Sequence, residues 1–505
     1  MNQLSNVHQN GGAPSELILA LGFEFQDLYT RDGLKRLDDA FLSDLAESVP
    51  ELRAQLLMAR QDPFAFTRKS GSELIIAVAP YVEDFIGGLF GIETELRDLQ
   101  LRHSALAPLY FVKRRFVQKR ALTGMTAEKA LDINGPAIGA ELAEFLNGEL
   151  TERSFAEHVA RWMEADAEHT KHLQLAAQYA AWAVLTPEGR AKHAKGVLFK
   201  MPHKLDMHHL VATESVAADG LVHIQMNASH WRHRQGFELT DPGTDLIGAL
   251  DQAHYCIKCH NQGKDSCSTG LKEKDGTTFK SSVFGVPLAG CPLDEKISEM
   301  NVVKENGNPI GALAVITIDN PMAAGTGHRI CNDCMKSCIF QKQEPVDIPQ
   351  VETRSLKDVL ELPWGFEIYS LLTRWNPLNF ARPYPVAPTG KKVLVVGLGP
   401  AGFTLSHHLI NDGHTVVAVD GLKIEPLPAD VSGVDAKGTR QPFRPLRDIT
   451  EIYERLGDRV MAGFGGVAEY GITVRWNKNF LKVIRLLLER RTAFSMFGGV
   501  RFGGT

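Results

Sequence analysis

Apolar residues recur at helical spacing over most of the first 200 positions of this chain. Phe155 and Trp162 begin one such pattern, in which apolar side chains return every three to four residues until Pro187 ends the run. A second amphipathic run covers 95–122. We therefore predict a mainly helical domain over 1–245, and the pattern assigns no chemistry to it.

Strand patterns are shorter and lie mostly near the C-terminus. A short strand is predicted at 221–226, and the apolar run 391–396 predicts a buried strand. A helix at 403–411 and a second strand at 415–419 follow, and a further helix is predicted at 449–456. The order strand, helix, strand predicts a parallel α/β unit.

Prolines between 376 and 390 favour an extended connection and indicate a domain boundary. We place this boundary at 385, so that a middle segment covers 246–385 and a last segment covers 386–505. The predicted fold class is multidomain and α-rich, with an α/β unit in the last segment.

The composition is that of an ordinary soluble protein, with 44% apolar residues, 23% charged residues and a net charge of −5. This charge gives no general attraction to nucleic acid or anionic membranes. No apolar run is long enough to span a bilayer and no signal peptide is visible, so we expect a cytoplasmic protein. The basic run 113–120 is expected to be a solvated helix face, with partner or membrane contact as the alternative. Polar roles are expected for His203, His208 and His209, because no cysteine shares a metal-site spacing with them.

Cysteine is confined to one window of the chain. The seven cysteines are Cys256, Cys259, Cys267, Cys291, Cys331, Cys334 and Cys338. In a cytoplasmic protein such a cluster indicates metal binding rather than disulfides. Iron–sulfur clusters take four soft thiolate ligands each, and seven cysteines fall one short of two such sets. A tetrahedral zinc site at Cys256, Cys259, Cys331 and Cys334 is the alternative, as is a single or vestigial cluster.

A glycine-rich loop lies directly between the predicted strand 391–396 and the helix that follows it. It reads Gly397-Leu398-Gly399-Pro400-Ala401-Gly402. Gly397 permits a tight turn, Gly399 lets a pyrophosphate approach the backbone, and Gly402 allows the helix to pack closely on the strand. Asp420, at the end of the second strand, would accept hydrogen bonds from a ribose. This arrangement predicts a dinucleotide site, but the motif itself does not separate FAD from NAD.

The cysteine window resembles the helical iron–sulfur domain of the glutamate synthase small subunit and dihydropyrimidine dehydrogenase family. The resemblance rests on Asp251-Gln252-Ala253 before Cys256, on Cys291-Pro292, on Asn320-Pro321 before Cys331, and on 344–352 after Cys338. It implies an α-helical ferredoxin-like domain at 246–385 that holds two 4Fe-4S clusters.

The resemblance also implies two interleaved ligand sets. Cys256, Cys259, Cys267 and Cys338 would hold one cluster, and Cys291, Cys331, Cys334 and Glu352 would hold the other. Seven residues separate Cys259 from Cys267, more than is usual in the family, and 270–290 looks like a loop insertion. Cys331 and Cys334 are closer than usual. His254, His260 and His328 are expected to be polar neighbours of the sulfurs.

The last segment resembles the flavin module of the same family. The glycine loop and the downstream residues Gly466 and Val467 resemble its FAD site. The resemblance implies an incomplete Rossmann-type FAD-binding domain, with NADPH or NADH bound by a second unit that this sequence lacks. We therefore expect a fragment that is inactive as an enzyme in this form.

The function implied is the electron-transfer part of an NAD(P)H-dependent FAD and iron–sulfur oxidoreductase, which passes electrons to a redox partner subunit or domain. No residue is assigned as an acid–base catalyst. Two alternatives remain open at this point. One is a zinc-stabilised helical binding module fused to a nucleotide-binding Rossmann fold, and the other is an NAD-dependent dehydrogenase fragment with a structural metal.

Overall fold

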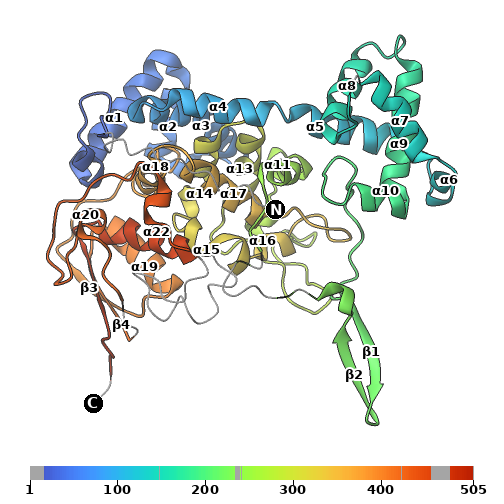
Figure 1. Ribbon diagram of the computed structural model, residues 1–505. Coiled ribbons are helices and arrows are strands. Elements are labelled where there is room, and N and C mark those ends of the chain that lie inside the picture. The colour runs from blue at the N-terminus through green and yellow to red at the C-terminus, as the bar shows by residue number, and fades with distance from the viewer. Residues whose placement is uncertain are drawn as a thin grey trace.

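Helices dominate the chain, and its two sheets are small (Figure 1). The computed structural model describes residues 16–146, 148–231, 233, 239, 241–421, 424–455 and 478–503. The predicted α-rich class is confirmed. Within the described ranges, no helix combines the length and the apolar character needed to cross a membrane.

The first helices pack on the middle of the chain. They are α1 (Arg31–Ser48), α2 (Pro50–Gln61), α3 (Arg68–Phe90) and α4 (Glu93–Ser104). The Thr67 side chain caps α3 by accepting from the backbone N–H of Ser70, and the helix ends at Gly91, whose φ is +62°. Phe41 packs edge-on against Trp375 with 6.0 Å between ring centroids, and both are fully buried. One continuous core therefore joins the first hundred residues to the middle and last segments.

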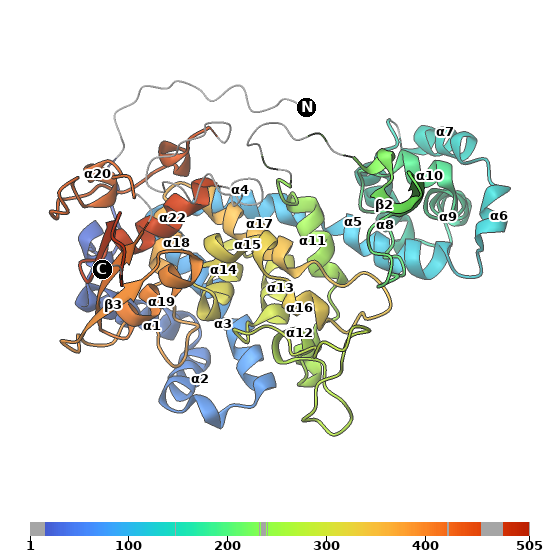
Figure 2. The ribbon, with the colours of Figure 1, turned by 90° about the horizontal axis from the view of Figure 1, so that it is seen from below.

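Residues 107–201 form a second helical unit with a core of its own, which we call the outer helical unit. Its elements are α5 (Ala107–Val112), η3 (Lys113–Ala121), α6 (Ala127–Leu131), α7 (Gly135–Phe145), α8 (Glu152–Glu164), α9 (Thr170–Leu185) and α10 (Pro187–Lys192). The helical pattern predicted from Phe155 is confirmed, because Phe155, Val159 and Tyr179 are buried together. In both views this unit lies to one side of the other helices (Figures 1 and 2).

The basic run 113–120 is only partly solvated, which corrects the predicted solvated face. It forms the π-helix η3, in which Phe116 and Val117 are fully buried in the second core. Lys113 is also buried, and its Nζ lies 2.6 Å from Oδ1 of Asp251. The apolar members of the run hold η3 against α5 and α9, so only part of its surface faces water.

A two-stranded ribbon projects from the molecule after the outer helical unit (Figure 1). The predicted strand β2 (Leu221–Met226) is confirmed, and it pairs antiparallel with β1 (Thr213–Ala218), which was not predicted. Asp219 and Gly220 form the two-residue turn with φ values of 52° and 76°. Every residue of both strands is exposed, so this ribbon adds nothing to either core.

The middle segment is a group of helices around α14. Its longer helices are α11 (Leu246–Tyr255), α13 (Ile297–Glu305), α14 (Pro309–Asp319), α15 (Ala323–Ile330), α17 (Ile348–Leu360) and α18 (Gly365–Leu372). Nearly the whole of α14 is buried, because α3, α13 and α17 pack around it. Shorter pieces carry cysteines: η5 (Cys259–Gln262), α12 (Ser266–Thr269) and α16 (Asp333–Lys336). The predicted loop 270–290 has no helix or strand and is closed by isolated bridges.

The last segment contains a three-stranded parallel sheet with β4 in the centre. Its strands are β3 (Lys392–Val396), β4 (Thr415–Asp420) and β5 (Phe494–Gly498), in the order β3-β4-β5. α19 (Pro400–Asn411) connects β3 to β4, and α22 (Lys478–Glu489) precedes β5. The predicted order of strand, helix and strand is confirmed, whereas β5 was not predicted.

Two predictions in this segment were wrong. The strand β3 is not buried, since Leu394 and Val396 are 50% and 56% exposed. It is an edge strand, and Val395 is its one buried residue. The helix predicted at 449–456 is a short 3-10 turn, η6 (Ile449–Ile452), because the extended backbone of Tyr453 ends it.

Candidate functional site

Four of the seven cysteines line one cavity. Cys256 ends α11, Cys259 begins η5, Cys267 lies in α12, and Cys338 follows α16. The cavity encloses about 300 Å³ of empty space. Its remaining walls are mainly apolar: Ile257, Ile297, Ile339, Phe340, Val346 and Ile348, with Asp265 and Ser298. These four cysteines are the first of the two sets expected from the family resemblance.

The backbone turns sharply between the first two cysteines. Lys258 has a φ of 57°, which is uncommon for a residue with a side chain. Its amide N–H lies 3.5 Å from the Cys256 sulfur, and its ammonium group lies 2.7 Å from Glu305. This turn brings the two thiols of the Cys-x-x-Cys pair to the same cavity.

Burial makes these thiols hard to ionise. It raises the pKa of Cys256 and raises that of Cys259 to about 12, with a smaller contribution from the carboxylate of Asp265. Cys267 donates a hydrogen bond to the Cys338 sulfur, which raises the pKa of Cys267 and lowers that of Cys338. Without a bound cation, the cavity therefore favours the protonated forms of Cys256, Cys259 and Cys267.

The remaining cysteines come together with Glu352 of α17. Cys334 is buried, and its pKa is raised first by that burial and then by the negative charges of Glu352, Glu295, Cys291 and Cys331. Burial, with a smaller contribution from the Glu295 carboxylate, raises the pKa of Cys291 to about 12. The second expected set is therefore gathered in one place, and Glu295 is added to it.

Sequence reasoning missed Glu295, which lies four residues after Cys291. It is 6% exposed, and it accepts a hydrogen bond from the Glu352 carboxyl group. Burial and the neighbouring Glu295 raise the pKa of Glu352 well above its ordinary value. The only available signal was an acidic residue soon after Cys291-Pro292.

The two sets lie next to each other. The backbone N–H of Cys291 donates to the carbonyl oxygen of Cys267 at 2.8 Å. The N–H of Gly290 donates to the hydroxyl of Ser337 at 2.9 Å, next to Cys338. All seven cysteines are free thiols. In the parts of the chain that the structure describes, no group of three or more cysteine, histidine, aspartate or glutamate side chains has the geometry to hold a single metal ion.

Asn301 is a buried amide without a hydrogen bond to any described residue. It lies in α13 and is completely buried, and both its Nδ2 and its Oδ1 are unpartnered. Burial raises the pKa of Cys256, and the nearby Asn301 amide offsets a small part of that rise. A buried amide that makes no hydrogen bond costs free energy, so the Asn301 amide is suited to form a hydrogen bond with a group that binds in the cavity.

Two of the histidines around the cysteines have polar partners, as expected, whereas the side chain of His328 lies outside the described residues. His254 stacks on Tyr110 with 4.6 Å between ring centroids, and its Nδ1 lies 3.4 Å from Glu305. His260 is buried and hydrogen-bonded to Ser298. Two of the exposed histidines further upstream also have carboxylate partners, since His209 pairs with Asp206 and His203 pairs with Glu344. His208 instead packs edge-on against the Phe284 ring.

The glycine loop has the geometry that its motif predicts for the backbone. Gly397 has a φ of +100°, which a residue with a side chain rarely adopts. A Cβ atom at Gly402 would lie 1.9 Å from the carbonyl oxygen of Gly397, so only glycine fits there. A Cβ atom at Gly399 would meet nothing within 4 Å, which leaves space in front of the loop. Pro400 and Ala401 then begin α19.

Asp420 supports the loop from the end of β4. Its Oδ2 accepts a hydrogen bond from the backbone N–H of Leu398 at 2.7 Å. The N–H of Gly397 donates to the carbonyl oxygen of Val419 at 2.8 Å. Asp420 therefore holds the loop in place, a role that the motif did not indicate. The other two residues expected at a nucleotide site, Gly466 and Val467, lie outside the described residues.

Comparison with known proteins gives several similarities. Residues 19–91 match a family described as the RP005 N-terminal alpha-helical domain. The chain is 52% identical over 182 residues to the protein RP006 of Rickettsia prowazekii, which is 36% of this chain and 24% of that protein. It is 29% identical over 140 residues to the glutamate synthase [NADPH] small chain of Mycobacterium tuberculosis, which is 27% of this chain and 25% of that protein.

A similarity to RP005 identifies the family. The chain is 30% identical over 301 residues to RP005 of Rickettsia prowazekii, and the aligned region is 57% of this chain. It covers 98% of RP005, whereas the chain spans only about a quarter of the length of RP006. The chain belongs to the RP005 family.

Proposed function

We propose that this chain is the electron-transfer part of an FAD- and iron–sulfur-dependent oxidoreductase that draws on NADPH or NADH. The observation that carries the proposal is the grouping of the cysteines. Four that are distant in sequence line one cavity, and the other three gather with Glu352 in a second place beside it. The partial similarity to a glutamate synthase small chain points to the same redox class.

The residues present fit iron–sulfur clusters. Buried thiols and carboxyl groups are concentrated where no described lysine or arginine forms an ion pair with them. Iron ions would supply the positive charge that lets these groups ionise, as metal ions do for thiols elsewhere. The unpartnered amide of Asn301 would gain a sulfur acceptor.

In this proposal Cys256, Cys259, Cys267 and Cys338 hold one 4Fe-4S cluster as thiolates. Cys291, Cys331, Cys334 and Glu352 would hold the second, with Glu295 beside them. A carboxylate is a harder ligand than a thiolate, so the two sites differ in the electron density that they supply. When bound, such clusters exchange single electrons.

The glycine loop is the proposed FAD site. The N-terminus of α19 presents unpaired backbone N–H groups and a partial positive charge to a phosphate, and the open space at Gly399 lets the phosphate approach. In this proposal, the described residues contain neither the site that binds the nicotinamide nucleotide nor the partner that takes the electrons. The residues of this chain bind and position the groups, and none is assigned as an acid–base catalyst.

Anaerobic purification of the full chain tests the proposal. We expect brown protein with broad visible absorption, and about eight iron atoms and eight acid-labile sulfides per chain after reconstitution. Flavin binding is measured separately from the quenching of FAD fluorescence. Colourless protein with one zinc ion and no acid-labile sulfide would contradict the proposal and favour a zinc-stabilised module.

A further inference from the structure

A polar cavity is lined by no residue of the two cysteine sets or of the glycine loop. It is bounded by the C-terminal ends of α14 and α18, by the proline-containing connection, and by the last turns of α19. Its volume is about 270 Å³, which is close to the lower limit for small-molecule sites. Arg374, Arg382, His407, Asn376 and Asn411 are among the side chains that line it.

The electrostatic character of this cavity is positive. Arg374 is 5% exposed, and its guanidinium donates to carbonyl oxygens of Leu28 and Ser370 and stacks on Tyr29. Arg382 is exposed and forms an ion pair with Asp412. None of the described residues that line the cavity is acidic. Two guanidinium groups therefore border this space. Arg382 is paired with Asp412, and Arg374 lies near the Glu367 carboxylate.

His407 adds a buried, neutral side chain. It is 1% exposed, and it shares a hydrogen bond with Asn411, with 3.0 Å between its Nε2 and Nδ2 of Asn411. Burial keeps the imidazole neutral by lowering its pKa well below the ordinary value. Oδ1 of Asn411 has no hydrogen-bond partner among the described residues. A buried carbonyl oxygen without a donor costs free energy that a bound hydroxyl group would recover.

We propose that this cavity binds a small metabolite that carries two oxyanion charges, such as a phosphate or a dicarboxylate. The two guanidinium groups match the charge, and the neutral His407 adds no charge that would oppose it. The polar Asn376 and Asn411 leave room for a hydroxyl or carbonyl group on the same molecule. This site does not depend on iron–sulfur clusters or on FAD.

Isothermal titration calorimetry on the full chain tests the site with inorganic phosphate and with succinate. Arg382→Gln should weaken binding about tenfold, because it removes a charge-assisted hydrogen bond. Asp412→Asn should strengthen binding several-fold, because Arg382 loses its competing partner. Both positions are exposed, so neither change threatens the fold.

Arg120→Gln is the matched control, because Arg120 and Asp166 form a similarly exposed ion pair in the outer helical unit. It should leave both titrations unchanged. Binding of phosphate alone or of succinate alone would identify the preferred oxyanion. Absence of binding by either anion overturns the proposal. Binding that Arg382→Gln leaves unchanged also overturns it, since the anion would then lie elsewhere, for example at the glycine loop.

Discussion

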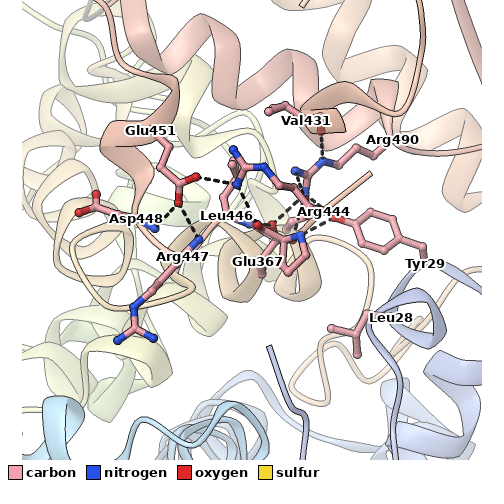
Figure 3. A network of polar contacts seen from close by, with 12 residues as sticks. Leu28, Tyr29, Glu367, Val431, Arg444, Leu446, Arg447, Asp448, Glu451 and Arg490 are labelled. Atoms are coloured by element: carbon pink, nitrogen blue, oxygen red, sulfur yellow. Dashed lines mark hydrogen bonds and ion pairs between the residues drawn. The ribbon is translucent and has the colours of Figure 1, made fainter. Parts of the chain in front are cut away.

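Arg490 and Glu367 form a buried ion pair that joins distant parts of the chain. Nη1 of Arg490 lies 2.8 Å and 3.0 Å from the two carboxylate oxygens of Glu367, and both side chains are almost completely buried. The hydroxyl of Tyr29 donates to the same carboxylate at 3.1 Å, as Figure 3 shows. Tyr29 lies within the family's N-terminal helical domain, and Arg490 follows α22. The pair thus fastens the beginning of the chain to its last segment.

Glu367→Gln should lower the free energy of unfolding by about 3–5 kcal/mol, the usual cost of removing one partner from a buried ion pair. Arg490 would be left with a buried charge whose nearest described carboxylate is gone. Chemical denaturation at neutral pH measures this loss. As a control, Asp166→Asn breaks the exposed pair with Arg120 and should cost less than about 1 kcal/mol. Equal losses in the two variants would contradict the role given to Glu367.

His103 should make the protein sensitive to mild acid. Burial, together with the charge of Lys304, lowers its pKa from 6.5 to about 4. The unfolded chain therefore takes up a proton as the pH falls below about 6.5, while the folded chain resists until about 4. Stability is lost over this interval, by up to about 3 kcal/mol.

His103→Asn should reduce that loss between pH 6.5 and pH 4, because Asn does not titrate and its amide can still donate towards the Leu99 carbonyl oxygen. The measurement is denaturation at several pH values. His209→Asn is the matched control, since His209 is exposed. If the pH profile is the same in His103→Asn and in the unaltered protein, His103 has the same pKa in the folded and unfolded states, which contradicts the prediction.

The two proposed cysteine sets predict which substitutions remove the same amount of bound iron. Cys267→Ser and Cys338→Ser should each remove about half of the bound iron, and so should the double variant, because all three disable the same cluster. Combining Cys338→Ser with Cys334→Ser should remove nearly all of it. Iron analysis and electron paramagnetic resonance read out the result. A double Cys267/Cys338 variant that loses all of its iron would refute this pairing.

Two glycines of the loop should separate folding from nucleotide binding. Gly402→Ala places a methyl group against the Gly397 carbonyl, so it should lower the melting temperature of the protein without any ligand. Gly399→Ala places its methyl group in open space and should leave the melting temperature unchanged. It should still weaken FAD binding by at least about tenfold, since the methyl group occupies the approach of the phosphates. Normal FAD affinity in Gly399→Ala would place the nucleotide elsewhere.

Residue spacing was sufficient to predict those helices and strands whose apolar pattern is visible within the element itself. The periodicity around Phe155 and the strands β2 and β4 followed from residue spacing alone. The strand β1 could have been found from the Asp219-Gly220 pair, which is typical of a two-residue hairpin turn. β5 could not, because Phe494–Gly498 is short and becomes a strand through its pairing with β4.

Tertiary packing decided the rest. Spacing could not predict that Lys113 is buried, because its partner Asp251 is distant in sequence. The same limit applies to the candidate site. The spacing of the cysteines left several groupings open, and only the family resemblance suggested two sets before the structure was known. Glu295 was missed because its proximity to Glu352 arises from the packing of distant segments.

The helix α11 belongs to both cores. Its Leu250 is buried in the core of the outer helical unit, and it ends at Cys256, which is buried in the main core and lines the first cysteine cavity. Tyr110 and Lys113 hold its outer side through hydrogen bonds to Ile247 and Asp251. A partner that shifts the outer helical unit would therefore shift the cavity, and by reciprocity whatever fills the cavity would alter the affinity for that partner by the same factor.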